Sequence, residues 1–501
     1  MITRIRTKFL LAYDENKNDH YIIPEGEIAY KDDEIIYIGE QYTGPIDREL
    51  DASKSLVSPG FIDLDALGDI DHTLLFFEHP KEKTYDLEWS YDYFTSERKE
   101  EMSLADESFK SLYAYVQLIR NGITTAMPIT SVIYKKAGET YEEIEAAAKH
   151  AGELGLRVYL GPSFLAKKHV LNPEGDERKI YDLPDEEVKE GIKNARKFIE
   201  HYHNAYNGLI QACVVPERIE LQTEDLLIKS KALAKEYKLM YRLHAAQGAF
   251  DYQMIQNKYG MSPIQYLDTI GLLDDQTLIP HCTYTSGTKY VNEKSNKDQE
   301  ILKKNQTSII HCPLVYARSG EALDSFGRFY REGVSITMGT DTFPCDPFIV
   351  MRTGQLAAKL LDNNRPENNL ENFYHAFTIG GADALGRKDL GRLAVGAKAD
   401  MIFINIDDFD LGVIDDPIQS LCLAGHGEMI TTSIINGKVV MNNREIPGIN
   451  LQDLEIQAQK YYEKMKHSYW KRSPARKDKT EKELFHQSYP IKNPYKSSNN
   501  E

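Results

Sequence analysis

Short apolar segments alternate with longer amphipathic segments over residues 56–390 of the chain. The apolar segments are rich in β-branched residues and predict strands. They cover residues 56–65, 122–130, 156–164, 208–215, 239–244, 277–281, 308–311 and 334–341. Between them, apolar residues recur at helical spacing and predict helices over 103–121, 140–154, 184–206, 224–237, 262–271 and 349–362. Eight strands alternating with helices predict an α/β fold, namely a (β/α)8 TIM barrel.

Both ends of the chain carry short β-type segments separated by Asp, Asn and Gly turns. Residues 1–58 predict one small antiparallel sheet, too small to be stable alone. Residues 390–445, with their Asn436-Gly437 hairpin signal, are predicted to complete this sheet. We therefore expect a composite β-sandwich built from both chain ends beside a barrel of residues 59–389.

Two further segments lie outside these repeating patterns. Residues 446–501 begin with a helical pattern at 454–467 and end in a polar tail that we expect to be mobile. An insertion of about residues 165–183 follows the third strand of the barrel. Because loops at that side of a barrel surround the active site, this insertion is a candidate lid.

Composition narrows the class of protein. The chain has 501 residues, whereas a single core stops growing near roughly 250–300 residues, so more than one structural unit is expected. The net charge of -17 disfavours binding to nucleic-acid phosphates. Five scattered cysteines without a Cys-x-x-Cys pair indicate free thiols in a reducing compartment. Without an apolar run of about 18 residues, no membrane span is predicted, and we expect a cytoplasmic protein.

Four polar residues stand at the ends of successive predicted strands. They are His244, His281, His311 and Asp341. In a barrel these strand ends converge on one mouth, where active sites are built. His and Asp side chains together hold a divalent metal, but they also transfer protons without one, and a buried polar network is a further interpretation.

Several motifs, in order, resemble one family. Ser58-Pro59-Gly60-Phe61-Ile62-Asp63, His311-Cys312-Pro313 and Gly339-Thr340-Asp341 are similar to its first, seventh and eighth barrel strands. Gly391-Arg392-Leu393-Ala394-Val395-Gly396-Ala397-Lys398-Ala399-Asp400 and Ile435-Asn436-Gly437-Lys438 are similar to its return to the β-sandwich. Over about residues 5–445, the chain resembles the amidohydrolase superfamily, in its cytosine deaminase and triazine hydrolase branch.

The resemblance implies a hydrolase acting on a non-peptide carbon–nitrogen bond of a small, cyclic substrate, through metal-activated water. His244, Asp341 and Asp65 would hold a mononuclear divalent metal, Zn or Fe. His281 would polarise the substrate or the water, and Asp341 would take the proton of the attacking water. Gln247 occupies the family's proton-shuttle position. The family is often dimeric, which implies a homodimer.

Three more residues are candidate substrate contacts. His311 ends the seventh strand, while Tyr284 and Arg318 follow the sixth and seventh strands, where substrate contacts are usual. Arg318 suits a carboxylate on a ligand, but a surface ion pair is an equal interpretation.

Two departures from the family pattern keep alternatives open. The family's His-x-His pair falls on Asp65-Ala66-Leu67, and of these side chains only Asp65 is able to bind a metal; Asp71 and His72 lie further along the same loop. Gln247 stands where the deaminases have a glutamate, although imidazolonepropionases also have glutamine there. One alternative is a catalytically degenerate amidohydrolase fold that binds a small ligand or a partner. Another is a metal-independent lyase or isomerase, with His281 and Asp341 as acid and base.

Overall fold

The computed structural model describes residues 1–70, 88–130, 132, 134–318, 320–323, 326–362 and 364–485. Eight parallel strands form its central sheet, and each hydrogen-bonds to the next. In order they are β6 (Phe61–Leu67), β7 (Ile123–Ile129), β8 (Arg157–Leu160), β11 (Ile210–Val214), β12 (Met240–Arg242), β13 (Thr277–Pro280), β14 (Ser308–His311) and β15 (Ile336–Met338). Just beyond β15, the Asp341 N–H donates to the Asp65 carbonyl in β6 at 2.8 Å, so the two edges of the sheet meet. The predicted TIM barrel is confirmed.

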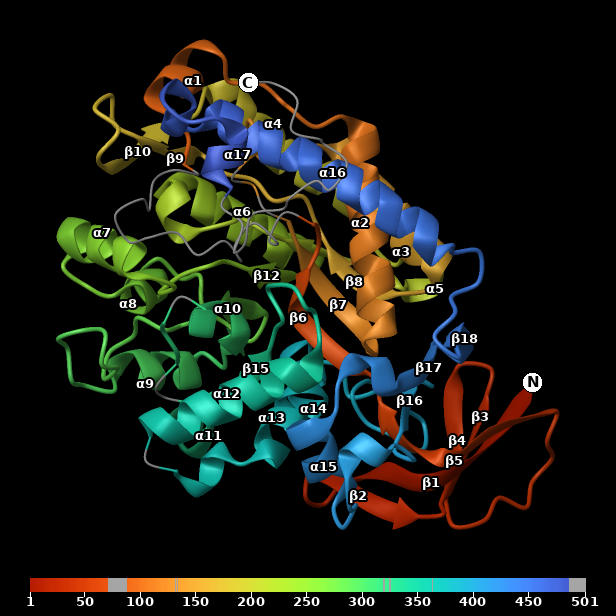
Figure 1. Cartoon of the computed structure of the whole chain (residues 1–501). Helices are drawn as coiled ribbons and strands as arrows, with labels where there is room; N and C mark the ends of the chain where they lie inside the picture. The colour runs from red at the N-terminus through yellow and green to blue at the C-terminus, as the bar shows by residue number, and fades with distance from the viewer. Residues whose placement is uncertain are drawn as a thin grey trace, which may run out of the picture.

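Helices surround the barrel (Figure 1). Those that follow its strands are α2 (Leu104–Arg120), α3 (Tyr141–Leu154), α4 (Asp185–Tyr202), α6 (Glu224–Tyr237), α7 (Ala249–Tyr259), α8 (Pro263–Thr269), α9 (Lys297–Lys304), α10 (Pro313–Arg318), α11 (Phe326–Glu332), α12 (Pro347–Leu361), α13 (Leu370–Phe377) and α14 (Ile379–Ala384). The shorter or later ones are α1 (Tyr91–Ser96), the kinked α5 (Ala205–Gly208), α15 (Pro417–Ala424), α16 (Leu451–Arg472) and α17 (Glu481–Leu484). Capping boxes at Ser103 and Thr140 start α2 and α3, because each side chain satisfies a free backbone N–H of the first turn. No helix in the described part of the chain is long and apolar enough to span a membrane.

The two ends of the chain share a second sheet (Figure 1, lower right). Its strand order is β18 (Lys438–Asn442), β17 (Ile430–Ile435), β16 (Met401–Asn405), β5 (Arg48–Pro59), β1 (Ile2–Asp14), β3 (Glu27–Lys31) and β4 (Glu34–Gly39), with β2 (Asp19–Pro24) paired to β1. The sheet was predicted to be antiparallel, but one of its pairings is parallel. β5 crosses to the far side of β1 and pairs with it in parallel before the chain enters the barrel. The division into domains at residues 58, 390 and 445 stays a prediction.

A buried ion pair fastens this second sheet to the barrel. Arg157 of β8 places Nη2 3.0 Å from Oδ2 of Asp400, which directly precedes β16. The other carboxylate oxygen of Asp400 accepts the Asn436 N–H at 2.6 Å. Asp400 is the last residue of the motif that begins at Gly391, and its role here is to join the second sheet to the barrel.

The insertion after the third strand forms a hairpin of β9 (Lys167–Leu171) and β10 (Arg178–Asp182). Lys168 in β9 donates to the carbonyl oxygens of Val132 and Lys135 at 3.0 and 2.7 Å, in the loop after β7. The hairpin is thus tied to its neighbouring loop.

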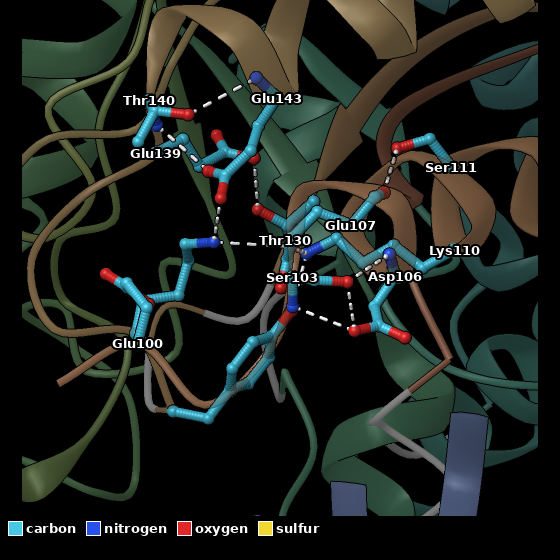
Figure 2. Close-up of polar contacts among 12 residues, drawn as sticks. Glu100, Ser103, Asp106, Glu107, Lys110, Ser111, Thr130, Glu139, Thr140 and Glu143 are labelled. Carbon is cyan, nitrogen blue, oxygen red and sulfur yellow. Dashed lines mark hydrogen bonds and ion pairs between the residues drawn. The ribbon is translucent and has the colours of Figure 1, made fainter. Parts of the chain in front are cut away.

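That loop is also fastened to α2 by a cluster of buried charges (Figure 2). The Glu107 carboxylate lies 2.6 Å from Lys110 Nζ and 3.2 Å from Lys135 Nζ. Lys135 Nζ in turn lies 2.8 Å from the carboxylate of Glu143 in α3. Because these cations are paired, they tolerate burial, and they fix the loop that carries Tyr134.

Candidate active site

Asp65 lies at the centre of a group of polar side chains at the barrel mouth. Its Oδ2 is 3.7 Å from His244 Nε2, 3.9 Å from His281 Nε2 and 3.6 Å from Cys312 Sγ. Asp341 Oδ2 is 3.7 Å from His281 Nε2. One donor atom from each of Asp65, His281, Cys312 and Asp341 lies within 4.8 Å of the others. The structure therefore brings together Asp65, His244, His281 and Asp341, which the sequence had placed at strand ends.

Backbone geometry at the strand ends aims these side chains. His281 and Asp341 have left-handed backbones, with φ of 70° and 52°. His281 nevertheless donates its N–H to the Ile310 carbonyl at 2.7 Å, so the turn stays anchored to the next strand. His244 Nδ1 lies 3.0 Å from the Glu217 carbonyl oxygen, which only accepts hydrogen bonds. Nδ1 therefore carries a proton, and Nε2 faces Asp65 Oδ2.

The two carboxyl groups of the site have opposite preferences for a proton. Burial raises the pKa of Asp65, but His244, Arg242 and His281 outweigh it and lower that pKa to about 2. Burial and the charge of Asp65 raise the pKa of Asp341 well above its usual value. Burial also lowers the pKa of His281 well below its usual value, so this ring is neutral. Paired groups with opposite proton affinity are typical of acid–base sites.

The site also contains buried polar atoms that form no hydrogen bond with the described residues. Asp65 Oδ1 and both ring nitrogens of His281 have no hydrogen-bond partner among the described residues. Leaving such atoms unpaired is costly, and a divalent cation would satisfy Asp65 Oδ1 and the unprotonated ring nitrogen of His281. Oxygen, nitrogen and sulfur donors together suit zinc or iron. The residues present thus fit the predicted mononuclear divalent metal.

Sequence reasoning missed Cys312 as a member of this donor set. The available signal was its place in His311-Cys312-Pro313, at the end of β14. Gly339 makes the approach of Cys312 to Asp65 sterically feasible. A Cβ at position 339 would lie 2.7 Å from Asp65 Cβ and 2.9 Å from Cys312 Sγ, both inside van der Waals contact.

A cavity of about 480 Å³ opens onto the site, and His244, Gln247, Asp341 and Leu67 line it. Arg218, which also lines it, donates to Gln247 Oε1. Tyr316 donates its hydroxyl to the Gln247 carbonyl at 2.6 Å. Gln247 is therefore held at both its side chain and its backbone. Arg218 was not predicted; it is the fourth residue after the end of β11, in Pro216-Glu217-Arg218.

The three residues predicted to contact substrate make other contacts in the protein. The His311 ring packs against Phe326 and Phe373, with ring centres 5.8 and 6.3 Å away. Tyr284 donates to the Glu321 carboxylate at 2.9 Å, and Arg318 donates to Thr342 Oγ1 at 2.8 Å. None of these three lines the cavity among the described residues, and their substrate contacts stay predictions. Asp71 and His72 lie outside the described residues.

Known proteins resemble this chain in sequence and in fold. The chain is similar to the 5-methylthioadenosine/S-adenosylhomocysteine deaminase of Aquifex aeolicus (strain VF5), with 26% identity over 468 residues, covering 89% of this chain and 96% of the relative. It resembles the zinc-bound crystal structure of an adenosine deaminase from Xanthomonas campestris, with a TM-score of 0.76 and 16% identity, covering 93% of this chain and 98% of the other. It also resembles the zinc complex of atrazine chlorohydrolase from Arthrobacter aurescens TC1, with a TM-score of 0.72 and 19% identity, covering 92% and 100%.

The family model described as "Amidohydrolase family" matches residues 56–440, which is most of the chain and includes every residue of the donor set. The predicted resemblance and the predicted type of enzyme, a hydrolase of carbon–nitrogen bonds other than peptide bonds, are confirmed. The chain belongs to the amidohydrolase family.

Proposed function

We propose that this chain removes an amino group from a small aminated heterocycle by hydrolysis, releasing ammonia. The observation that carries the proposal is the donor group of Asp65, His281, Cys312 and Asp341, within 4.8 Å of one another beside a cavity that admits a small molecule. Because the curated relative is named as a deaminase of adenosine derivatives, we propose aminated purine nucleosides as the substrate class.

The roles follow from the positions of the side chains. Asp65, His244 and Asp341 would hold the metal, with Cys312 within reach. A bound divalent metal would supply activation of the attacking water. Asp341, in its ionised form, would take a proton from that water, and His281, whose Nε2 is 3.7 Å from Asp341, would orient the reacting group.

Gln247 would bind substrate rather than transfer a proton. Arg218 occupies its amide oxygen, so its N–H2 group is the end that can be directed at a ligand. A hydrogen-bond acceptor on the substrate, such as a ring nitrogen, fits this donor. Since the amide of a glutamine does not act as an acid or a base near neutral pH, Asp341 would return to the leaving nitrogen the proton taken from water.

A second candidate function is binding without hydrolysis. The observation that favours it is Arg242, whose Nη1 lies 3.4 Å from Asp65 Oδ1. This fixed cation compensates part of the carboxylate charge that a metal would otherwise neutralise. Leu67, in place of a histidine, favours the same interpretation.

Metal content and ammonia release together distinguish the two candidates. For the deaminase we expect about one equivalent of Zn or Fe in protein purified without chelator, lost in Asp341→Ala but kept in Asp225→Ala, an exposed aspartate on α6. Ammonia release would be screened with aminated pyrimidines, purines, triazines and cyclic amides. A wild-type protein that takes up no Zn, Fe or Mn on supplementation would rule out the metal mechanism. Substrate binding without ammonia would favour the second candidate.

We also propose a cytoplasmic location and a homodimer. The five free, buried cysteines support a reducing, cytoplasmic location. A homodimer would be tested by light scattering.

A further inference from the structure

The C-terminal helix α16 lies outside the residues that match the family model, which end at 440. Yet it is packed firmly on the barrel, alongside α2 (Figure 1). Lys464 of α16 pairs with Asp106 of α2, and the ring of Tyr461 lies 6.4 Å from that of Phe109. Met465, the next residue after Lys464, is fully buried. The helix is thus an integral part of the structure rather than a loose appendage.

The end of α16 reaches the loops at the barrel mouth. Arg472, its last residue, is fully buried, and its carbonyl accepts the Ser90 N–H at 2.8 Å. Its guanidinium lies 5.5 Å from the centre of the Trp89 ring, on whose face Lys168 also lies at 4.4 Å. It also donates to the carbonyl of Tyr134 at 3.4 Å. The loops after β6 and β7 and the β9–β10 hairpin therefore all meet at the end of α16.

Tyr469, one turn before the end of α16, lines the same cavity as His244 and Asp341. Its side chain is buried in the fold, with 4% of its surface exposed. The guanidinium of Arg472 lies 4.4 Å from the centre of its ring and holds it by a cation–π contact. An aromatic ring held in this way offers a flat, rigid contact surface at little cost in conformational entropy.

We propose that α16 forms a wall of the substrate cavity and that Tyr469 determines which substrates fit, by contact with the part of the substrate that does not react. This inference rests on the proposed function for the nature of the ligand. It adds a specificity-determining residue from a segment beyond the family match. Arg472 acts through Tyr469 as a positioning residue.

The chain offers a matched control in Tyr461. It lies on the same helix, is also 4% exposed, and packs against Phe109 of α2 rather than lining the cavity. Alanine at either position removes a buried ring from α16, so both variants carry a similar loss of stability. Only the variant at Tyr469 changes the cavity.

The kinetic arm measures KM and kcat for adenine, adenosine and 5-methylthioadenosine, which increase in size. We expect Tyr469→Ala to raise KM for the two nucleosides roughly fivefold to tenfold, the loss of one aromatic contact, with kcat and metal content nearly unchanged. Tyr469→Phe should have a KM close to that of wild type, since it keeps the aromatic ring. Equal KM changes in Tyr469→Ala and Tyr461→Ala, or none in either, would overturn the inference.

A labelling arm is independent of turnover. The five native cysteines are buried, so a single introduced thiol dominates alkylation by iodoacetamide. We expect Tyr469→Cys to be alkylated through the cavity much faster than Tyr461→Cys. Equal rates in the folded proteins would show that α16 does not border an open cavity. Failure of the proposed function would give a different result. The wild-type protein would then release no ammonia from any substrate.

Discussion

The guanidinium of Arg242 lies 3.4 Å from the carboxylate of Asp65, and both side chains are buried inside the barrel. Arg242 is held there by the carbonyl oxygens of Met127 and Pro128, at 2.6 and 2.9 Å. Two features thus occur together at this mouth. A carboxylate stands where the family has a histidine, and a fixed cation stands beside it. The cation lowers the attraction of the site for a metal, while the carboxylate raises it.

Removing the carboxylate should leave Arg242 as an unpaired buried charge. We expect Asp65→Ala to lower the free energy of unfolding by about 3–5 kcal/mol, measured by urea denaturation. The double variant Asp65→Ala/Arg242→Met should recover much of that loss, because it removes the unpaired cation. A double variant no more stable than Asp65→Ala would show that the ion pair is not the cause.

Filling the space at Gly339 should displace Asp65 or Cys312. A Cβ there would lie under 3 Å from both side chains, so Gly339→Ala is expected to cost about 1–3 kcal/mol of stability and to reduce bound metal. Thermal unfolding and elemental analysis measure the two effects. At Gly248 the nearest atom to an added Cβ is Asp251 Oδ1 at 3.8 Å, so Gly248→Ala should be tolerated. Equal losses in both variants would contradict the steric argument.

The ion pair between the sheet of the chain ends and the barrel should matter for stability but not for metal binding. Asp400→Ala leaves Arg157 buried without its partner, and we expect a loss of about 3–5 kcal/mol with unchanged metal content. The matched control is Asp407→Ala, which breaks an exposed pair with Lys54 and should cost less than about 1 kcal/mol. Loss of metal in Asp400→Ala would show that the junction shapes the site.

Stability should depend on pH through Glu220, at the cavity wall. Burial and the nearby charge of Asp251 raise its pKa to about 8. The folded state therefore holds a proton that the unfolded state releases near pH 4.5, so this stabilisation is full below pH 4.5 and is lost as pH rises through 8. Glu220→Gln cannot titrate. The free energy of unfolding would be measured by urea denaturation at pH 5, 7 and 9. Relative to wild type, that of Glu220→Gln should rise by roughly 2 kcal/mol or more as pH rises.

The exposed Glu186→Gln is the control for that experiment, since 87% of the Glu186 side chain is exposed. Its pH curve should run parallel to that of wild type. A Glu220→Gln curve that also ran parallel would mean that Glu220 is ionised in the folded protein.

Much of the fold followed from periodicity alone. The predicted helix at 140–154 became Tyr141–Leu154, and the predicted strand at 122–130 became Ile123–Ile129, because capping residues and β-branched runs mark these elements locally. The parallel pairing of β1 with β5 could not be predicted, since pairing direction depends on how the chain crosses the sheet.

The sequence predicted the residues of the site that stand at the ends of strands. Asp65, His244, His281 and Asp341 converge because parallel strands of a barrel end at one mouth. Arg242 was missed because it lies within β12, where the pattern predicts an apolar position. Tyr469 was missed because nothing in the local sequence shows which loops the end of a distant helix will reach.

The sheet shared by the two chain ends has a consequence for synthesis. β5 pairs with β16, and Pro59 stands opposite Met401, so about 340 residues must be made before the N-terminal strands obtain this partner. At roughly 5–20 residues per second, the edge of β5 stays unpaired for about 20–70 s on the ribosome. An unpaired strand edge is a template for aggregation. Newly made chains should therefore depend on chaperones most during the interval before β16 emerges.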